Sequence, residues 1–254
     1  MAAKPGILTG YEPQFDFPVR DRPPEKLWLL ATVPRSGSTF VSHLLWASGC
    51  LGAPLEYLNF EPAGPYGFAS QSPTRQAELW RSALHRRTAP NGVFGLKAFP
   101  LQFEDLYPSN RALVDEVIRA LFARGRPAGI VHLRRRDTNA HAISYARALL
   151  SGIWRKEQES EDRPEPEYSR KAMQRAAQLI EQQESIWQAM FRDLQIAPLE
   201  IWYEDVLDDP EGAKSSVASH LNIDLDPAAG VTVPPIERQS QVGARAWAEA
   251  SARD

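Results

Sequence analysis

Residues 33–40, VPRSGSTF, combine the residue types of an anion-binding loop. The stretch follows the apolar run LWLLATV and opens the apolar run FVSHLLWASG, a pattern that predicts a turn from a buried strand into a helix. Backbone N–H groups at a helix N-terminus point outward, and the helix dipole favours negative charge there. Gly37 lets a ligand approach the backbone, and Arg35 carries a planar charge suited to phosphate or sulfate. Hydroxyl donors come from Ser36, Ser38 and Thr39. A capped turn with an incidental arginine is the alternative.

The loop differs from a nucleoside-triphosphate loop, which reads G-x-x-x-x-G-K-[ST]. The first glycine and the lysine of that pattern are both absent. Glu204 and Asp205 end a later apolar stretch, but without such a loop they are weak evidence of a metal site. A kinase or an ATPase is therefore disfavoured.

A second candidate anion site lies where VHLRRRDTNAHAISYA runs from an apolar stretch into a helical pattern. It offers Arg134, Arg135 and Arg136, with Ser144 about two helical turns later. An arginine triplet is often a solvated surface turn, yet ligands of open α/β sheets bind at the carboxyl ends of the strands, where this triplet is expected. Two anion sites on one sheet suggest a nucleotide with phosphates at both ends.

Four apolar runs are expected to form the strands that position these loops: residues 27–33, 93–98, 129–133 and 199–206. Helical patterns alternate with them, in residues 39–48, 107–125, 138–150, 171–194 and 211–221. The alternation predicts an α/β fold, a three-layer α/β/α arrangement like that of P-loop proteins, with a central, mostly parallel sheet.

Two charged, proline-bearing segments break this alternation. Residues 1–26 are expected to form an irregular N-terminal arm, which leaves residues 27–254 as a single domain. Residues 151–170 form either a solvated loop or a substrate lid, because long loops in compact domains are often functional.

The composition is that of a globular protein of 254 residues, with 43% hydrophobic and 24% charged residues. A net charge of −3 argues against nucleic acid as a partner. A single cysteine, Cys50, fits a reducing compartment. No stretch has the length and apolarity of a signal peptide or a membrane span, so a cytoplasmic location without integral membrane association is expected. The five histidines form no zinc-type cluster, so no metal is expected.

Together the two loops resemble those of the sulfotransferases that use 3′-phosphoadenosine-5′-phosphosulfate (PAPS). PRSGST after one strand, and R-x-D followed by AISY after a later strand, carry this resemblance. Four further stretches, GCLGAPLEYLNF, NGVFGLK, AISYARALLSGIWR and IERQSQVGARAW, are similar to segments of the bacterial trehalose 2-sulfotransferase-like group. The matching segments keep their order and spacing along most of the chain.

The resemblance implies a role for each matching residue. The 5′-phosphosulfate would be bound by Arg35, Ser36, Gly37, Ser38 and Thr39. Arg135 and Ser144 would bind the 3′-phosphate, although the spacing from arginine to serine is one residue longer than in the common eukaryotic sulfotransferases, which leaves the choice among the three arginines open. Arg238 and Gln239 would help to close the nucleotide site.

The acceptor proton needs a base, and the resemblance places it at Glu56. Many eukaryotic members carry Lys-Thr-His after the acceptor region, with the histidine as base, but this chain reads Lys-Ala-Phe at residues 97–99. Phe99 cannot accept a proton, whereas Lys97 can stabilise charge near the sulfuryl group. In the trehalose sulfotransferase-like group the glutamate of P-x-E is the proposed base, and burial or a nearby charge can tune such a carboxylate. His141 is a lesser alternative.

The implied reaction moves the sulfuryl group by in-line displacement to a hydroxyl of a carbohydrate or glycolipid acceptor. Tyr57, Trp154 and Arg155, with Glu56, are expected to bind the acceptor, because aromatic and charged groups suit stacking and hydrogen bonding to sugars. The group includes dimers, so a homodimer is a further expectation. Two alternatives stay open: a P-loop nucleotide kinase or NTPase, and a non-catalytic nucleotide-binding protein of the same fold.

Overall fold

The computed structural model describes residues 8–122, 129–155, 158–159, 164–236 and 241–253. Within them a sheet of four parallel strands has the order β2-β1-β3-β4. The strands are β1 (Lys26–Ala31), β2 (Val93–Ala98), β3 (Gly129–Arg134) and β4 (Leu199–Trp202). The predicted α/β fold with a central parallel sheet is confirmed.

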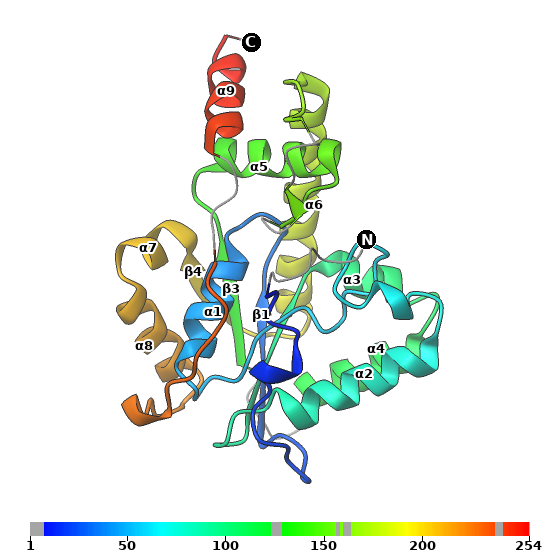
Figure 1. Ribbon diagram of the computed structural model, residues 1–254, viewed down its shortest axis with the longest axis vertical. Helices are drawn as coiled ribbons and strands as arrows, with labels where there is room; N and C mark the ends of the chain where they lie inside the picture. Colours follow the sequence, from blue (N-terminus) through cyan, green and yellow to red (C-terminus); the bar gives the residue numbers. More distant parts are fainter. Residues whose placement is uncertain (1–7, 123–128, 156–157, 160–163, 237–240, 254) are drawn as a thin grey trace.

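Helices follow and separate the strands (Figure 1). The longer helices are α1 (Ser38–Ala47), α2 (Pro73–Arg86), α4 (Arg111–Leu121), α5 (Thr138–Ser151), α6 (Arg170–Asp193), α8 (Pro210–His220) and α9 (Gln241–Ser251). The shorter ones are α3 (Pro100–Leu106) and α7 (Tyr203–Asp208), with 3-10 turns at Pro13–Phe15, Gly67–Ala69 and Pro227–Ala229. In the described ranges no helix is both long and apolar enough to cross a bilayer.

The sheet lies between two layers of helices. Successive residues of a strand face opposite sides, so β1 contributes to two cores. Leu29 and Ala31 pack with side chains of α2, α4 and α6, whereas Trp28 and Leu30 pack with those of α1 and α8. Figure 1 shows α1, α7 and α8 on one side of the sheet and α2, α3 and α4 on the other. A third cluster, around Trp247, joins α5, α6 and α9.

The predicted strand at residues 199–206 is wrong beyond Trp202, where α7 begins. The pair Arg134–Trp202 is the last one in the register of β3 and β4. Beyond it, the Glu204 carboxylate in the first turn of α7 accepts hydrogen bonds from the backbone N–H groups of residues 136 and 137, at 2.9 and 3.1 Å. Glu204 and Asp205 both stand in the first turn of α7, where the helix dipole favours carboxylates, so these residues favour a helix over a longer strand.

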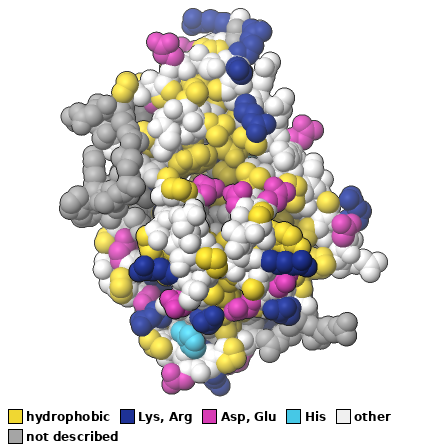
Figure 2. Space-filling view, turned by 90° about the vertical axis from the view of Figure 1, so that its right-hand side faces the viewer, with side chains coloured by type: hydrophobic (Ala, Val, Ile, Leu, Met, Phe, Trp, Pro, Cys, Tyr) yellow, Lys and Arg dark blue, Asp and Glu magenta, His cyan; other side chains and the backbone are white. Residues whose placement is uncertain are grey.

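The side of α2, α3 and α4 carries a hollow (Figure 2), with hydrophobic side chains above it and acidic side chains along its lower border. Two exposed aromatic rings belong to elements of this side, Phe68 and Tyr107. Each lies under an arginine, with Arg75 at 5.1 Å and Arg111 at 5.2 Å from the ring centroid. Both rings thus make a cation–π contact while remaining exposed to solvent.

Candidate active site

The loop after β1 leads its backbone directly into α1. Gly37, with φ of 88°, is the N-cap and has no side chain that could cap the helix. Beneath the loop, Ser36 Oγ lies 2.7 Å from Thr32 Oγ1, and Thr32 in turn donates to the Leu133 carbonyl at 3.1 Å. The hydroxyl of Thr32 has one proton, so Ser36 is the donor to Thr32. The loop is thus fixed from below and leads into the first turn of α1, and the N–H groups of a first helical turn favour an anion.

Arg35 crosses from this loop to α5. Its φ of 69° is uncommon for a residue with a side chain. Its Nε donates to Ser144 Oγ at 3.0 Å and its Nη1 donates to the Trp154 carbonyl. Burial, together with the positive charges of Arg147 and Arg135, lowers the pKa of Arg35 to about 10. The guanidinium stays charged at neutral pH, and an anion bound among these cations would relieve their repulsion.

Arg135 donates a hydrogen bond directly to the loop. Among the described residues, Arg134 and Arg136 make no hydrogen bond to it. The Nη1 of Arg135 donates to the Arg35 carbonyl at 3.3 Å, and its guanidinium lies 5.5 Å from the centroid of the Tyr203 ring. Its Nε is buried and makes no hydrogen bond among the described residues, and Glu204 Oε1 lies 4.0 Å from it as a long ion pair. A buried cationic donor without a hydrogen bond is a group that a bound phosphate would satisfy.

The other two arginines of the triplet are committed to carboxylates. Arg134 Nε lies 3.1 Å from Glu184 Oε2. Arg136 binds Asp205 through two hydrogen bonds, at 2.7 and 2.9 Å. The geometry favours Arg135 for an anion site, because the carboxylate that pairs with it, Glu204, lies 4.0 Å away, farther than the carboxylates that hold its two neighbours.

A second cluster forms where the chain after α1 runs beside β2. A parallel bridge joins Leu55 to Leu96, and the Lys97 backbone N–H donates to the Leu55 carbonyl at 3.1 Å. This pairing places Glu56 next to Lys97, with Lys97 Nζ 3.0 Å from Glu56 Oε1. Both side chains are buried, so their attraction is screened little by water.

Three polar residues that the sequence did not predict complete the surroundings of Glu56. Asn59 Nδ2 donates to Glu56 Oε2 at 2.7 Å, and Gln102 Nε2 lies 3.5 Å from the same oxygen. The backbone N–H of Glu56 donates to the hydroxyl of Tyr11 at 3.0 Å. Asn59 could have been found from its place in the segment GCLGAPLEYLNF, whereas the composition of the arm gave no sign of Tyr11.

Burial by itself raises the pKa of Glu56. The charges of Lys97 and Arg155 and the hydrogen bond from Asn59 outweigh burial and lower this pKa to about 2. Burial also lowers the pKa of Lys97, against the opposing effect of Glu56. Glu56 is therefore a carboxylate at any working pH, which is the form that can accept a proton.

The predicted acceptor-binding residues occupy three different positions. Arg155 lies over the ring of Tyr11, with its Cζ 5.4 Å from the centroid. Trp154 is partly buried and gives its carbonyl to Arg35. Tyr57 is fully buried, with its hydroxyl donating to the Ala53 carbonyl at 2.6 Å, so it packs beneath the site. Arg155 thus lies by the Glu56 cluster and Trp154 by Arg35 of the first loop, whereas Tyr57 belongs to the core.

His141 lies under the first loop. Its Nε2 donates to the Pro34 carbonyl at 2.8 Å, and burial lowers its pKa to about 4. A neutral ring tied to a carbonyl supports the loop, so the geometry favours Glu56 over His141 as the base. Arg238 and Gln239 lie outside the described residues. In the described ranges, no three or more His, Cys, Asp or Glu side chains form a group that could hold a metal ion.

We expect the Glu56–Lys97 pair to make stability depend on pH in the acid range. The pKa of Glu56 falls from an ordinary value of 4.5 to about 2 on folding. A depressed carboxyl pKa stabilises the fold above the unfolded value, here by about 3 kcal/mol, and this is lost as pH falls from about 5 toward 2. Urea unfolding at several pH values should show this loss in the wild type and not in a Glu56→Gln/Lys97→Met double variant. Parallel pH curves for the two proteins would contradict it.

The Stf0 sulphotransferase family matches residues 27–254 of the chain. The trehalose 2-sulfotransferase of Mycobacterium tuberculosis (strain ATCC 35801 / TMC 107 / Erdman) is 27% identical over 256 residues, which cover 87% of this chain and 92% of that protein. The trehalose 2-sulfotransferase of Mycolicibacterium smegmatis is 26% identical over 262 residues, covering 89% and 94%. A solved sulfotransferase domain of the Synechococcus PCC 7002 olefin synthase matches with a TM-score of 0.45 and 17% identity, over 92% of this chain and 98% of that one.

The chain is therefore a sulfotransferase, an enzyme that moves a sulfuryl group from a donor to an acceptor. More particularly, it belongs to the Stf0 sulphotransferase family. This confirms the resemblance to the trehalose 2-sulfotransferase-like group, and it favours sulfuryl transfer over the kinase or NTPase reaction that the first loop alone left open.

Proposed function

We propose that this enzyme transfers the sulfuryl group of PAPS to a hydroxyl of a carbohydrate, free or as part of a glycolipid. The observation that carries the proposal is the convergence of two anion sites, at the loop after β1 and at Arg135, near the buried pair of Lys97 and Glu56. PAPS carries a phosphosulfate and a separate phosphate on one nucleoside, so it needs two such sites. The names of the two mycobacterial relatives support a sugar as acceptor.

In the donor site, the amides at the start of α1 and the side chains of Ser38 and Thr39 hold the 5′-phosphosulfate. Arg135, whose Nε makes no hydrogen bond among the described residues, holds the 3′-phosphate together with Ser144. Arg35 already bonds to Ser144 and carries its charge between the two positions. Arg238 and Gln239 are proposed to close the nucleotide site.

The reaction is an in-line displacement in which the acceptor oxygen attacks sulfur. The new bond joins that oxygen to sulfur, the bond from sulfur to the phosphate oxygen breaks, and the phosphate keeps the electron pair. The acceptor proton passes to the Glu56 carboxylate. Negative charge grows on the leaving oxygen, where Arg35 and the α1 amides stabilise it by position and electrostatics.

Lys97 can interact with both the base, Glu56, and the sulfuryl group. At rest it holds the pKa of Glu56 low, which makes Glu56 a weak base. When Lys97 turns toward the negative sulfuryl oxygens, Glu56 loses one of the groups that counteract its burial, and its pKa rises. Proton transfer to Glu56 thus becomes favourable as the sulfuryl group enters the site.

Isothermal titration with adenosine 3′,5′-diphosphate, the product of PAPS donation, tests the donor site. We expect this ligand to bind more tightly than ADP or ATP with magnesium. Arg135→Ala should weaken binding by about 30-fold, because one hydrogen-bonded charge pair is lost. Arg136→Ala is the matched control, because Arg136 is engaged with Asp205 and should leave the affinity unchanged. Preference for ATP with magnesium, or equal loss in both variants, would overturn the donor assignment.

A further inference from the structure

The N-terminal arm reaches the catalytic pair although it lies outside the part of the chain that matches the family. The family match begins at residue 27, and the described part of the arm is residues 8–25. Phe17 of the arm is buried in the core beside α2, and its backbone N–H donates to the Arg86 carbonyl at 2.8 Å. The described part of the arm is therefore packed onto the domain, although its backbone is mostly irregular.

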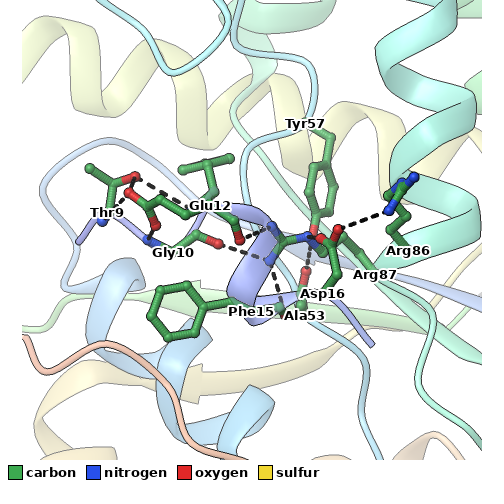
Figure 3. A network of polar contacts seen from close by, with 10 residues as sticks. Thr9, Gly10, Glu12, Phe15, Asp16, Ala53, Tyr57, Arg86 and Arg87 are labelled. Atoms are coloured by element: carbon green, nitrogen blue, oxygen red, sulfur yellow. Dashed lines mark hydrogen bonds and ion pairs between the residues drawn. The ribbon is translucent and has the colours of Figure 1, made fainter. Parts of the chain in front are cut away.

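Arg87, which follows α2, anchors the arm (Figure 3). Its guanidinium donates to the carbonyls of Gly10, Glu12 and Phe15, at 2.8, 3.1 and 3.3 Å. Its Nε lies 2.9 Å from Asp16 Oδ1. Arg87 is only 4% exposed, so one buried cation holds four successive points of the arm. Hydrogen bonds to a charged group are among the stronger ones, so the path of the arm is well defined.

The turn that carries Tyr11 is also stabilised by hydrogen bonds between its own residues. The Glu12 carboxylate accepts hydrogen bonds from the backbone N–H and the hydroxyl of Thr9, at 2.8 and 2.7 Å, and from the Gly10 N–H at 2.8 Å. Gly10 has φ of 92°, and a Cβ there would lie 3.2 Å from the ring of Trp46. The turn is therefore seated tightly on α1, which fixes the direction of the Tyr11 side chain.

Tyr11 lies between Glu56 and Arg155. Its hydroxyl accepts the Glu56 backbone N–H at 3.0 Å, and Arg155 covers its ring at 5.4 Å. The rings of Tyr57 and Tyr66 meet its edges, with centroids 6.4 and 5.5 Å away. Within the described part of the chain, no group accepts the proton of the hydroxyl itself. Burial raises the pKa of this phenol, so the proton is kept at all working pH values.

We propose that the arm forms a wall of the acceptor site and that Tyr11 is a specificity-determining residue, whose hydroxyl donates to an oxygen of the acceptor sugar beside the hydroxyl that is sulfated. This rests on the proposed function, because the acceptor has to reach Glu56. A phenol held by the Glu56 amide is fixed relative to the base, so it orients the sugar as well as binding it. Arg87 is then a positioning residue, which acts through the arm.

The test compares Tyr11→Phe with wild type in transfer from ³⁵S-labelled PAPS to trehalose. The ring and its packing remain in this variant, and only the hydroxyl is lost. We expect KM for trehalose to rise about tenfold, the effect of one lost hydrogen bond, with the affinity for adenosine 3′,5′-diphosphate unchanged. Tyr107→Phe, on an exposed tyrosine after α3, is the control. An unchanged KM in Tyr11→Phe would overturn the proposal.

Arg87→Met tests whether the arm acts as a unit. It should raise KM for trehalose as Tyr11→Phe does, and the two changes should not add in the double variant, because both remove the same contact. Arg86→Met is the matched control: Arg86 also pairs with Asp16, at 3.4 Å, but half of its side chain is exposed. Additive effects, or equal effects of both arginine variants, would contradict a positioning role.

Hydrogen exchange separates this proposal from the function on which it rests. The Glu56 amide should exchange slowly in wild type and faster in Tyr11→Phe and Arg87→Met, whether or not the protein turns over. Equal exchange rates would overturn the docking of the arm even if trehalose is sulfated. Wild-type protein that binds no adenosine 3′,5′-diphosphate and transfers no label would instead overturn the proposed function.

Discussion

Glu56→Gln is expected to lower kcat by about a thousandfold, the range of a lost general base. The amide has nearly the shape of the carboxylate and can keep a contact with Lys97, which lies 3.0 Å away, but it cannot accept the acceptor proton. Donor binding should stay within about twofold of wild type, because the anion sites use other residues. The measurement is steady-state transfer from labelled PAPS to trehalose, with the donor affinity taken from titration.

Loss of folding is the main confounding effect in this experiment. Removing the charge of Glu56 leaves Lys97 as a buried cation without a counter-charge, which costs about 3 kcal/mol or more. The Glu56→Gln/Lys97→Met variant removes both charges and should regain melting temperature but not activity. Glu61→Gln, on an exposed acid five residues away, controls for the loss of negative charge nearby. Retention of more than a tenth of the wild-type kcat by Glu56→Gln would assign the base elsewhere.

Most of the sheet could be predicted from the sequence, because β1, β2 and β3 are largely buried on both faces. The expected strand at residues 129–133 became β3, Gly129–Arg134, and the one at 93–98 became β2. Continuous apolar runs carry this information locally. The strand predicted at residues 199–206 was wrong in its second half, because residues 203–206 belong to α7, and so few residues do not distinguish a short helix from a strand.

The meeting of charged groups could be predicted only in part. The motif named Glu56 and Lys97 separately, but their ion pair depends on the bridge between Leu55 and Leu96, a long-range contact without a periodic pattern. The arginine triplet left three candidates, and the structure separates them by their partners on α6, on α7 and in the loop after β1. Such partners come from distant segments, so no local feature of the triplet could identify Arg135.

The position of Tyr11 was even harder to predict from the sequence than the ion pair or the choice of Arg135. Proline and charge in the arm predicted irregular backbone, and the backbone is mostly irregular, but irregular chain can still be held in one place. Arg87, which holds the arm, lies 72 to 77 positions downstream of the carbonyls that it binds. It follows a helix that was not predicted from the sequence, although Ser72 and Pro73 are a cap and a first-turn proline. Without α2 in the prediction, the arm had no predicted surface to bind.

Gly37→Ala is expected to weaken binding of adenosine 3′,5′-diphosphate by at least about a hundredfold, because it disturbs both anion sites at once. A Cβ on Gly37 would lie 2.2 Å from two atoms of the Tyr203 ring. Either the loop shifts away from the Tyr203 ring, or the ring moves away from the loop. The first response shifts the amides at the start of α1. The second removes the ring from the Arg135 guanidinium, which lies 5.5 Å from its centroid.

The matched control for this variant is Gly92→Ala. Gly92 has φ of 86°, close to the 88° of Gly37, so alanine meets a similar backbone strain, about 1 kcal/mol, at both positions. A Cβ on Gly92 would meet the side chain of Glu25, which is flexible and more than half exposed, and the position precedes β2, at the opposite end of the parallel sheet from the loop. Both variants should melt at lower temperature than wild type, while titration shows lost affinity in Gly37→Ala alone. Wild-type affinity in Gly37→Ala would mean that the loop backbone does not hold the phosphosulfate, and the 5′ half of the donor site would have to lie elsewhere.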